Sequence, residues 1–347
     1  MISEPEAAQQ NVQEKSKKIL TDIAGYVSVR TINIGLELDL FSEIAKHTDG
    51  ISVQELAKIT GLDPVYLEVW MKSAYGSELM ESNGMNTFKL APFVDKLLLD
   101  RDFSGYIGGL PKVMMQPEMF GNFSSNMKSG NRTWWDKTSN EWIKSVIETT
   151  RPMYTRMLKV GNEKIPGLEE KLKNGAHVLE LASGAGDGIT RTAQKYVNCT
   201  FVGVDCDDYS IELAKESTSK LNLSNRIKYQ KCMFEDINDH FNDEFDIVTI
   251  NASIHEARDL EKVISSVYKT LKTDGYFVIS DFPFPDDLEG LKTVPARIMS
   301  GIQFFESQID DLLLPTQIYV ELMKKHGFKD IISFDLTPTH MVVNGRK

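Results

Sequence analysis

From residue 175 onwards, short runs of β-branched and other apolar residues alternate with segments whose apolar residues have helical spacing. Parallel strands and their connecting helices show this sequence pattern, because the helices cover both faces of the sheet and leave the strands fully buried. We therefore predict an open α/β sheet in this half of the chain. The expected strands are 177–181, 200–205, 227–231, 245–251, 276–281, 329–334 and 340–344.

A glycine-rich turn, Ala182 to Gly188, follows the first expected strand, and Asp205 ends the second. In a doubly wound sheet, glycine lets the backbone approach a ligand at this turn. An acid about twenty residues later accepts hydrogen bonds from the ribose hydroxyls. The pattern predicts a nucleoside-binding site at the carboxyl ends of these strands.

The spacing of the glycines bears on which nucleoside is bound. A dinucleotide site requires G-x-G-x-x-G, whereas Gly184, Gly186 and Gly188 form G-x-G-x-G. Glu180 would repel a pyrophosphate but attract the sulfonium and ammonium groups of S-adenosylmethionine. The residues therefore favour S-adenosylmethionine over NAD.

The chain resembles the class I S-adenosylmethionine-dependent methyltransferases. The segments 178–188 and 201–205 resemble the first two motifs of that family, and 271–275 followed by 276–281 looks like its loop and fifth strand. The resemblance implies a Rossmann-like sheet of seven strands in the order 3-2-1-4-5-7-6, with an antiparallel last strand. It also implies S-adenosylmethionine as cofactor, bound by Glu180, Ala182, Ser183, Gly184, Gly186, Asp205, Cys206, Met233, Phe234, Asn251 and Ala252.

Two further segments resemble small-molecule O-methyltransferases. Residues 232–234, Cys-Met-Phe, are similar to the Asp-Met-Phe that lines the adenine in those enzymes, although Cys232 replaces the acid that accepts the adenine amine. Residues 251–256 are similar to the segment that carries the catalytic histidine and a following acid. The resemblance thus implies catalytic roles for His255, as general base, and for Glu256.

A base at this position makes chemical sense, because a hydroxyl attacks the sulfonium methyl far better once its proton is leaving. Neutral imidazole accepts such a proton near pH 7 and contributes roughly 10²- to 10⁴-fold. A histidine at a strand end is also often a cap or a core residue. The sequence leaves the acid that would orient His255 open, with Asp281 and Glu306 as candidates by approximate position.

The N-terminal part predicts a winged helix after a helix at 19–44. Ser52 and Glu55 form a capping box, Gly61 ends that helix, and Asp63 caps the next one. Asn83-Gly84 is a strong hairpin signal between 78–81 and 87–90.

Charge disfavours DNA as the partner of this winged helix. The whole chain carries a net charge of −11, and residues 1–110 hold 16 acidic against 10 basic residues. Nucleic-acid binding draws its affinity from Lys and Arg neutralising phosphates, so we expect no nucleic-acid partner. Dimerisation is the better use of this domain. The expected division is 1–108 as a winged-helix dimerisation domain, 109–170 as a helical connector, and 171–347 as the catalytic domain.

The connector contains aromatic and Met residues that suit either core packing or the wall of a substrate pocket. The candidates for the pocket wall, from the connector and the later chain, are Trp134, Trp142, Met153, Tyr154, Phe282 and Phe305.

Cysteine use and hydropathy limit the remaining possibilities. Three cysteines without metal-ligand spacing predict neither a disulfide framework nor a metal site. No apolar stretch approaches the roughly 18 residues that cross a bilayer, and the N-terminus is polar, so we expect a cytoplasmic protein without a membrane partner.

The sequence therefore predicts an S-adenosylmethionine-dependent methyltransferase that acts on the oxygen of a small aromatic or hydroxylated molecule. An N-, S- or C-methyltransferase working by proximity stays open, as does a non-catalytic regulatory dimer that binds S-adenosylmethionine. The acceptor itself is left open.

Overall fold

The computed structural model describes residues 4–84, 86–133 and 135–347, which divide at Met115 into two compact units. The expected boundaries at 108 and 170 stay predictions. In the part of the chain that the structure describes, no helix is both long and apolar enough to cross a membrane.

The first unit contains a three-stranded antiparallel sheet in the order β1-β3-β2. Its elements are α1 (Glu4–Glu37), α2 (Leu40–Ile44), β1 (Ile51–Ser52), α3 (Val53–Thr60), α4 (Pro64–Gly76), β2 (Met80–Ser82), β3 (Thr87–Leu90), α5 (Val94–Leu98) and α6 (Gly109–Met114). A helix-turn-helix of α3 and α4 followed by the β2–β3 pair is a winged helix, as the sequence predicted.

Local sequence explains the limits of these helices. Ser52 Oγ accepts the Glu55 N–H at 3.2 Å while Glu55 accepts the Ser52 N–H at 3.0 Å, which completes the capping box at α3. Asp63 caps α4. The expected helix at 19–44 is divided in two, because Asp39 adopts a left-handed conformation (φ 53°) that Asp tolerates better than most residues.

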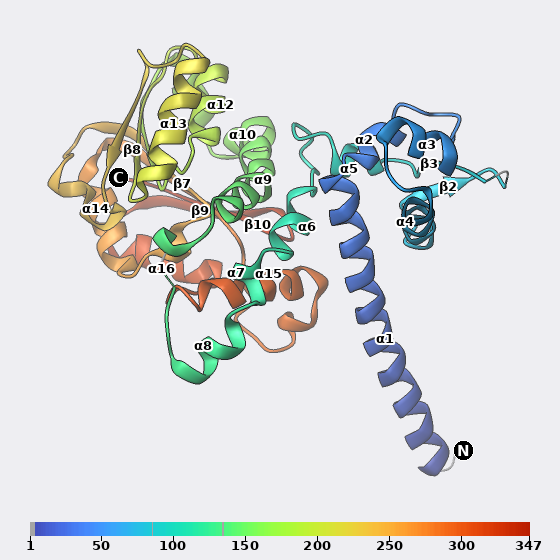
Figure 1. Cartoon of the computed structure of the whole chain (residues 1–347). Helices are drawn as coiled ribbons and strands as arrows, with labels where there is room; N and C mark the ends of the chain where they lie inside the picture. Colours follow the sequence, from blue (N-terminus) through green and yellow to red (C-terminus); the bar gives the residue numbers. More distant parts are fainter. Residues whose placement is uncertain (1–3, 85, 134) are drawn as a thin grey trace. The chain divides into compact units, whose positions relative to one another are not determined.

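The second unit is built on a seven-stranded sheet in the order β6-β5-β4-β7-β8-β10-β9, with β10 antiparallel to both neighbours (Figure 1). This is the predicted order 3-2-1-4-5-7-6. The strands are β4 (His177–Leu181), β5 (Thr200–Asp205), β6 (Ile227–Lys231), β7 (Phe245–Asn251), β8 (Leu271–Asp281), β9 (Lys329–Thr337) and β10 (His340–Arg346).

The helices of this unit precede and connect the strands. They are α7 (Pro117–Phe120), α8 (Phe123–Ser129), α9 (Asn140–Arg156), α10 (Asn162–Lys164), α11 (Leu168–Asn174), α12 (Asp187–Lys195), α13 (Asp208–Lys220), α14 (Leu260–Thr270), α15 (Val294–Glu306) and α16 (Thr316–Lys325). Short 3-10 turns are η1 (Trp135–Lys137), η3 (Phe234–Asp239), η4 (Ile254–Glu256) and η5 (Gly290–Lys292), and a π-helical turn, η2 (Met157–Gly161), continues α9.

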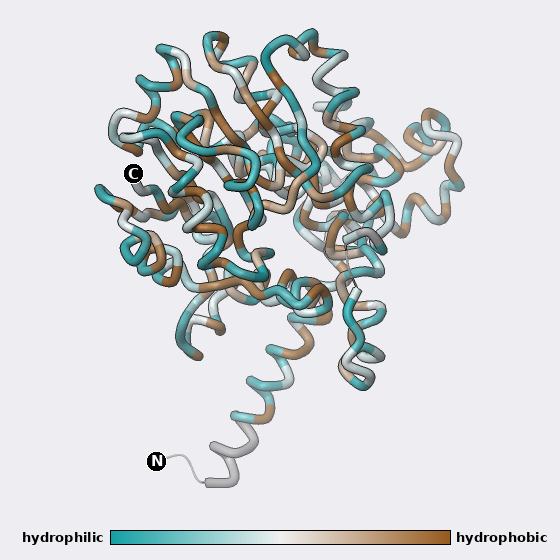
Figure 2. Tube along the Cα trace, turned by 90° about the vertical axis from the view of Figure 1, so that its left-hand side faces the viewer, coloured by the Kyte–Doolittle hydropathy of each residue, from teal (hydrophilic) through white to brown (hydrophobic). Residues whose placement is uncertain are grey.

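The sheet has a separate apolar cluster on each face, because side chains alternate along each strand. On β4, Leu179 and Leu181 belong to one cluster and Val178 to the other. Apolar residues accordingly follow the strands in the interior of this unit (Figure 2). Burial on both faces fixes the strands, so their carboxyl ends are held in place as a platform for a site.

Candidate functional site

The turn after β4 has an unusual backbone conformation. Ala182, Gly184 and Gly186 all have positive φ, at 49°, 51° and 76°, before α12 begins at Asp187. A Cβ atom on Gly186 would come within 2.6 Å of the Tyr229 hydroxyl oxygen, so only glycine fits there. Hydrogen bonds from the Ser183 N–H to the Val204 carbonyl oxygen and from the Gly186 N–H to the Ser183 carbonyl oxygen hold the turn at the end of the strand.

Two alanines adopt left-handed conformations at the ends of neighbouring strands. Ala182 follows β4 and Ala252 follows β7, with φ of 49° and 54°. This conformation costs an alanine roughly 1–2 kcal/mol and is common where backbone strain serves a site. Both residues line the same pocket.

Asp205 connects the ends of β4 and β5. Its carboxylate accepts the Gly184 N–H at 2.8 Å with one oxygen and the Asp207 N–H at 2.9 Å with the other. Burial raises the pKa of Asp205, while these two N–H groups act in the opposite direction. Each oxygen keeps a second lone pair for a ligand.

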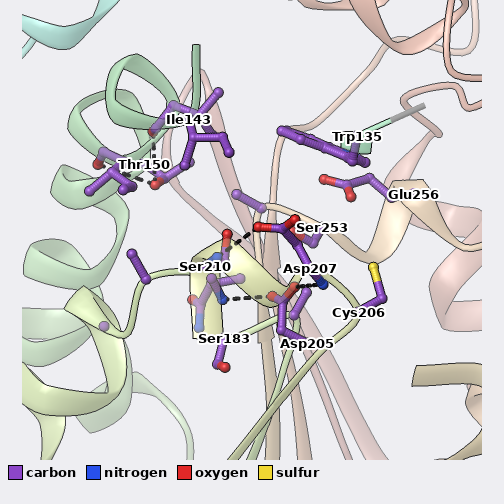
Figure 3. Close-up of a pocket in the computed structure, with 18 of the residues that line it drawn as sticks. Trp135, Ile143, Thr150, Ser183, Asp205, Cys206, Asp207, Ser210, Ser253 and Glu256 are labelled. Atoms are coloured by element: carbon purple, nitrogen blue, oxygen red, sulfur yellow. Dashed lines mark hydrogen bonds between the residues drawn. The ribbon is translucent and has the colours of Figure 1, made fainter. Parts of the chain in front are cut away.

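The pocket lies between these strand ends and α9 (Figure 3). Nine of the eleven predicted cofactor residues line it: Ala182, Ser183, Gly184, Asp205, Cys206, Met233, Phe234, Asn251 and Ala252. Gly186 caps α12 at the end of the turn and does not line the pocket. Glu180 lies instead at a smaller cavity beside α9 and α11.

Of the pocket residues on α9, sequence reasoning named only Tyr154 and missed Ile143, Ile147 and Thr150. These four residues are spaced by four, three and four positions, which marks one face of a helix and was the available signal. An Arg151–Asp187 ion pair joins α9 to the start of α12.

Glu180 is 3% exposed and accepts a hydrogen bond from the Tyr154 hydroxyl at 3.0 Å. Burial raises the pKa of Glu180 to about 8, against the effect of that hydrogen bond. A buried carboxyl of this kind is neutral at pH 7 until a positive group lies beside it.

These residues fit S-adenosylmethionine. Asp205 has free lone pairs for a ribose. Among the described residues, no positively charged group lowers the pKa of Glu180. Ser183 Oγ is buried and makes no hydrogen bond to any residue that the structure describes. A nucleoside that carries an ammonium group has hydroxyl and cationic groups of the kinds that these side chains lack as partners.

His255 lies in η4, immediately after β7, and is 4% exposed. Its Nδ1 is 2.9 Å from both carboxylate oxygens of Asp281, at the end of β8. Its Nε2 is 3.7 Å from Glu306 Oε1 on α15, which is longer than a hydrogen bond. Burial opposes a charge on His255, but the two carboxylates outweigh it and raise its pKa well above 6.5. Both acids that the sequence left as candidates therefore face this imidazole.

The next residue, Glu256, lines the pocket itself. Burial and the nearby Glu306 raise the pKa of Glu256 well above 4.5. After the end of β7, the imidazole of His255 is therefore buried, whereas the carboxyl group of Glu256 lies at the pocket.

Most of the candidates for the substrate wall are packed in the core. The rings of Trp142 and Phe305 are 4.1 Å apart, and Met153 packs with Phe282. Tyr154 lines the pocket, as does Trp135. Trp134 lies outside the described residues.

Metal-binding geometry is not found in the described part of the chain, where no three His, Cys, Asp or Glu side chains are placed to hold an ion. Cys199, Cys206 and Cys232 are free thiols.

Comparison with known proteins gives one family and several relatives. Residues 172–335 match the family described as methyltransferase domain. The ubiquinone/menaquinone biosynthesis C-methyltransferase UbiE of Citrifermentans bemidjiense is 30% identical over 218 residues, which are 57% of this chain and 92% of that protein. Sterol 24-C-methyltransferase of Saccharomyces cerevisiae is 27% identical over 169 residues, 48% of this chain. This second match spans only 42% of the sterol enzyme's length.

Two solved structures share the fold across both units. Mitomycin 7-O-methyltransferase superposes with a TM-score of 0.71 at 15% identity, covering 98% of this chain and 99% of that one. Human N-acetylserotonin methyltransferase, in complex with S-adenosylmethionine, gives 0.69 at 14% identity, with 96% and 97% covered.

Proposed function

This chain belongs to the class I S-adenosylmethionine-dependent methyltransferases, and we propose that it methylates an oxygen of a small aromatic or hydroxylated acceptor with His255 as general base. The enzyme class and the cofactor follow from the family. The identity of the methylated atom, the acceptor and the site residues are our proposal.

The observation that carries the proposal is the Asp281–His255 pair at the ends of β8 and β7. A carboxylate on Nδ1 holds the imidazole in one orientation and stabilises the imidazolium that forms. Nε2, which lies 3.7 Å from Glu306 Oε1, is the nitrogen that accepts the proton. Nε2 takes the proton of the acceptor hydroxyl as its oxygen becomes methylated. Bound S-adenosylmethionine would supply the methyl group from its sulfonium, and the electrons of the carbon–sulfur bond would stay on sulfur.

The cofactor roles we propose follow the pocket. Asp205 would accept the ribose hydroxyls, and Glu180 would pair with the ammonium group. Met233 and Phe234 flank the adenine. Cys232 donates its S–H to the Met233 carbonyl oxygen at 3.1 Å, so it does not replace the acid that accepts the adenine amine in similar enzymes.

We expect the methyl-transfer rate constant to rise with pH through a midpoint above about 6.5. The Asp281 and Glu306 carboxylates raise the pKa of His255, and only the unprotonated imidazole can accept a proton. Asp281→Asn removes one of these charges and should move the midpoint to lower pH. Rates measured between pH about 6 and 10 test this. A midpoint below that of free histidine contradicts it.

The first unit has an exposed apolar face that we propose as a homodimer interface. Tyr66 and Val69 of α4 are 81% and 66% exposed, and they line one hollow with Val27, Ile34 and Leu38. Obligate homodimer interfaces are large and apolar, commonly above about 2,000 Å².

Val69→Glu should therefore convert a dimer into monomers, because a charge buried in an apolar interface has no partner there. Light scattering at micromolar protein measures the mass. Glu81→Gln, in the wing, is the control and should stay dimeric. A monomeric parent protein at these concentrations refutes the interface.

A second function has a specific observation behind it. The two sequence relatives above are named as C-methyltransferases, and Asp281 and Glu306 raise the pKa of His255 against the effect of its burial, which favours the protonated imidazole. An N-, S- or C-methyltransferase that works by proximity needs no base at His255. Because the chain is an enzyme, the non-catalytic role is set aside. Chemical analysis of the methylated product decides between the two functions.

A further inference from the structure

The residues around His255 form an acidic cluster, which we define as Glu256, Asp281, Glu306 and Asp311. Asp281 and Glu306 face the two ring nitrogens of His255. Burial and the charge of Glu306 raise the pKa of Asp311 to about 7. Burial and the charges of Glu306 and Asp311 raise the pKa of Glu256, which also lines the pocket.

Among the residues that the structure describes, the positive charge near the cluster does not balance these four carboxyl groups. His255 lies between two of them, and Arg258 acts on Asp311. Glu306 is 4% exposed, and its Oε2 makes no hydrogen bond to any residue that the structure describes. Buried carboxylates are stable only when they are paired, so a site of this composition is complementary to a cation.

The wall of the pocket beside Glu256 is aromatic. Trp135 lines the pocket, and its ring packs edge-on against Phe305 at 5.4 Å. Glu256 and Trp135 are drawn on one side of the pocket, and Ile143 and Thr150 of α9 on the other (Figure 3). A cation binds favourably against an indole face, and more so when water is excluded.

An organic cation suits this site better than a metal ion. No group of three potential ligands within the described residues has metal-binding geometry. A single pocket carboxyl beside an indole matches a protonated amine, which takes one charged partner and one aromatic face.

We propose that the methyl acceptor carries a positively charged nitrogen, bound by the carboxylate of Glu256 and the face of Trp135. The inference rests on the proposed function and adds the class of its acceptor: a small amine that also bears the hydroxyl group to be methylated. A neutral or acidic phenol would leave the carboxyl group of Glu256 without a partner.

The test is a binding experiment in which no methyl group can transfer. The full chain is saturated with S-adenosylhomocysteine and titrated in a calorimeter with tyramine, and separately with 4-(2-hydroxyethyl)phenol, which differs mainly in lacking the charge. We expect tyramine to bind about ten- to a hundredfold more tightly, because a charge-assisted contact is gained.

Two variants locate the contact. Glu256→Gln should remove most of the preference for the amine while leaving the affinity for S-adenosylhomocysteine within about twofold. Trp135→Leu should weaken tyramine more than the alcohol. Glu216→Gln, on the exposed part of α13, is the matched control and should change nothing, and thermal unfolding confirms that each variant is folded.

Three results overturn the inference. Equal affinity for the two compounds removes the charge recognition, and so does the absence of binding by both at about 10 mM. Weakened cofactor binding in Glu256→Gln, with an unchanged amine preference, would assign the carboxyl to the cofactor. These outcomes do not depend on whether His255 is the base, because the complex contains no methyl donor and only binding is measured.

Discussion

His255→Ala is expected to lower the methyl-transfer rate constant by about 10²- to 10⁴-fold while S-adenosylmethionine affinity stays within about twofold. The imidazole takes up a proton only as the acceptor attacks, so its removal affects the transition state and not cofactor binding. His255 is absent from the residues that line the cofactor pocket, which agrees with this separation. Single-turnover release of S-adenosylhomocysteine measures the rate constant, and calorimetry measures the affinity.

Controls separate a base from a structural histidine. His240→Ala changes an exposed histidine at the end of η3 and should leave the rate unchanged. Asp281→Asn keeps the shape of the pair but weakens the base, so its limiting rate, measured above the pH midpoint, should lie between those of the wild type and His255→Ala. If His255→Ala retains more than about a third of the wild-type rate constant, proximity rather than proton transfer carries the reaction.

The strands of the sheet could be predicted because each one has a recognisable local sequence pattern. Burial on both faces demands near-continuous apolar runs, and the central strands have them. The edge strands β6 and β9 are partly exposed and have more polar sequences, but they too were predicted. The order of the strands followed only from family resemblance, since periodicity does not encode which strands pair. β8 begins at Leu271, five residues before its apolar run, because its first residues pair with β7 around an irregular register at Phe245.

The site was predictable where its residues lie on strand ends and not where they come from distant helices. Asp205 and the glycine turn carry their roles in local spacing. The partners of His255 do not: Asp281 is 26 residues away, and Glu306 comes from a helix after a long loop. Only the tertiary packing of α15 against η4 and β8 brings them to one imidazole.

Departures from the family pattern are accommodated by backbone geometry. Ala182 replaces a glycine of the turn, and the structure places it at positive φ, where the small side chain limits the strain. The alanine makes the turn more rigid than glycine would.

Asp205→Ala is expected to weaken S-adenosylmethionine binding by about 10²-fold or more. Two ribose hydrogen bonds to a carboxylate contribute about 1.5–3 kcal/mol each, so the loss of both corresponds to at least that factor. The same side chain also accepts the N–H groups of Gly184 and Asp207, which hold the turn against β5. Calorimetric titration with S-adenosylmethionine measures the change.

Asp205→Asn distinguishes recognition from shape. The amide has nearly the volume of the carboxylate, but its NH₂ group must face either Gly184 or Asp207, whose N–H groups are donors themselves. One backbone contact and one ribose contact are therefore lost, and affinity should fall between the wild type and the alanine variant. Asp208→Asn changes an exposed neighbouring acid that pairs with Lys231 and should bind normally. Unchanged affinity in both Asp205 variants would place the cofactor elsewhere, because no other acid is positioned by both the glycine turn and the end of β5 among the residues described.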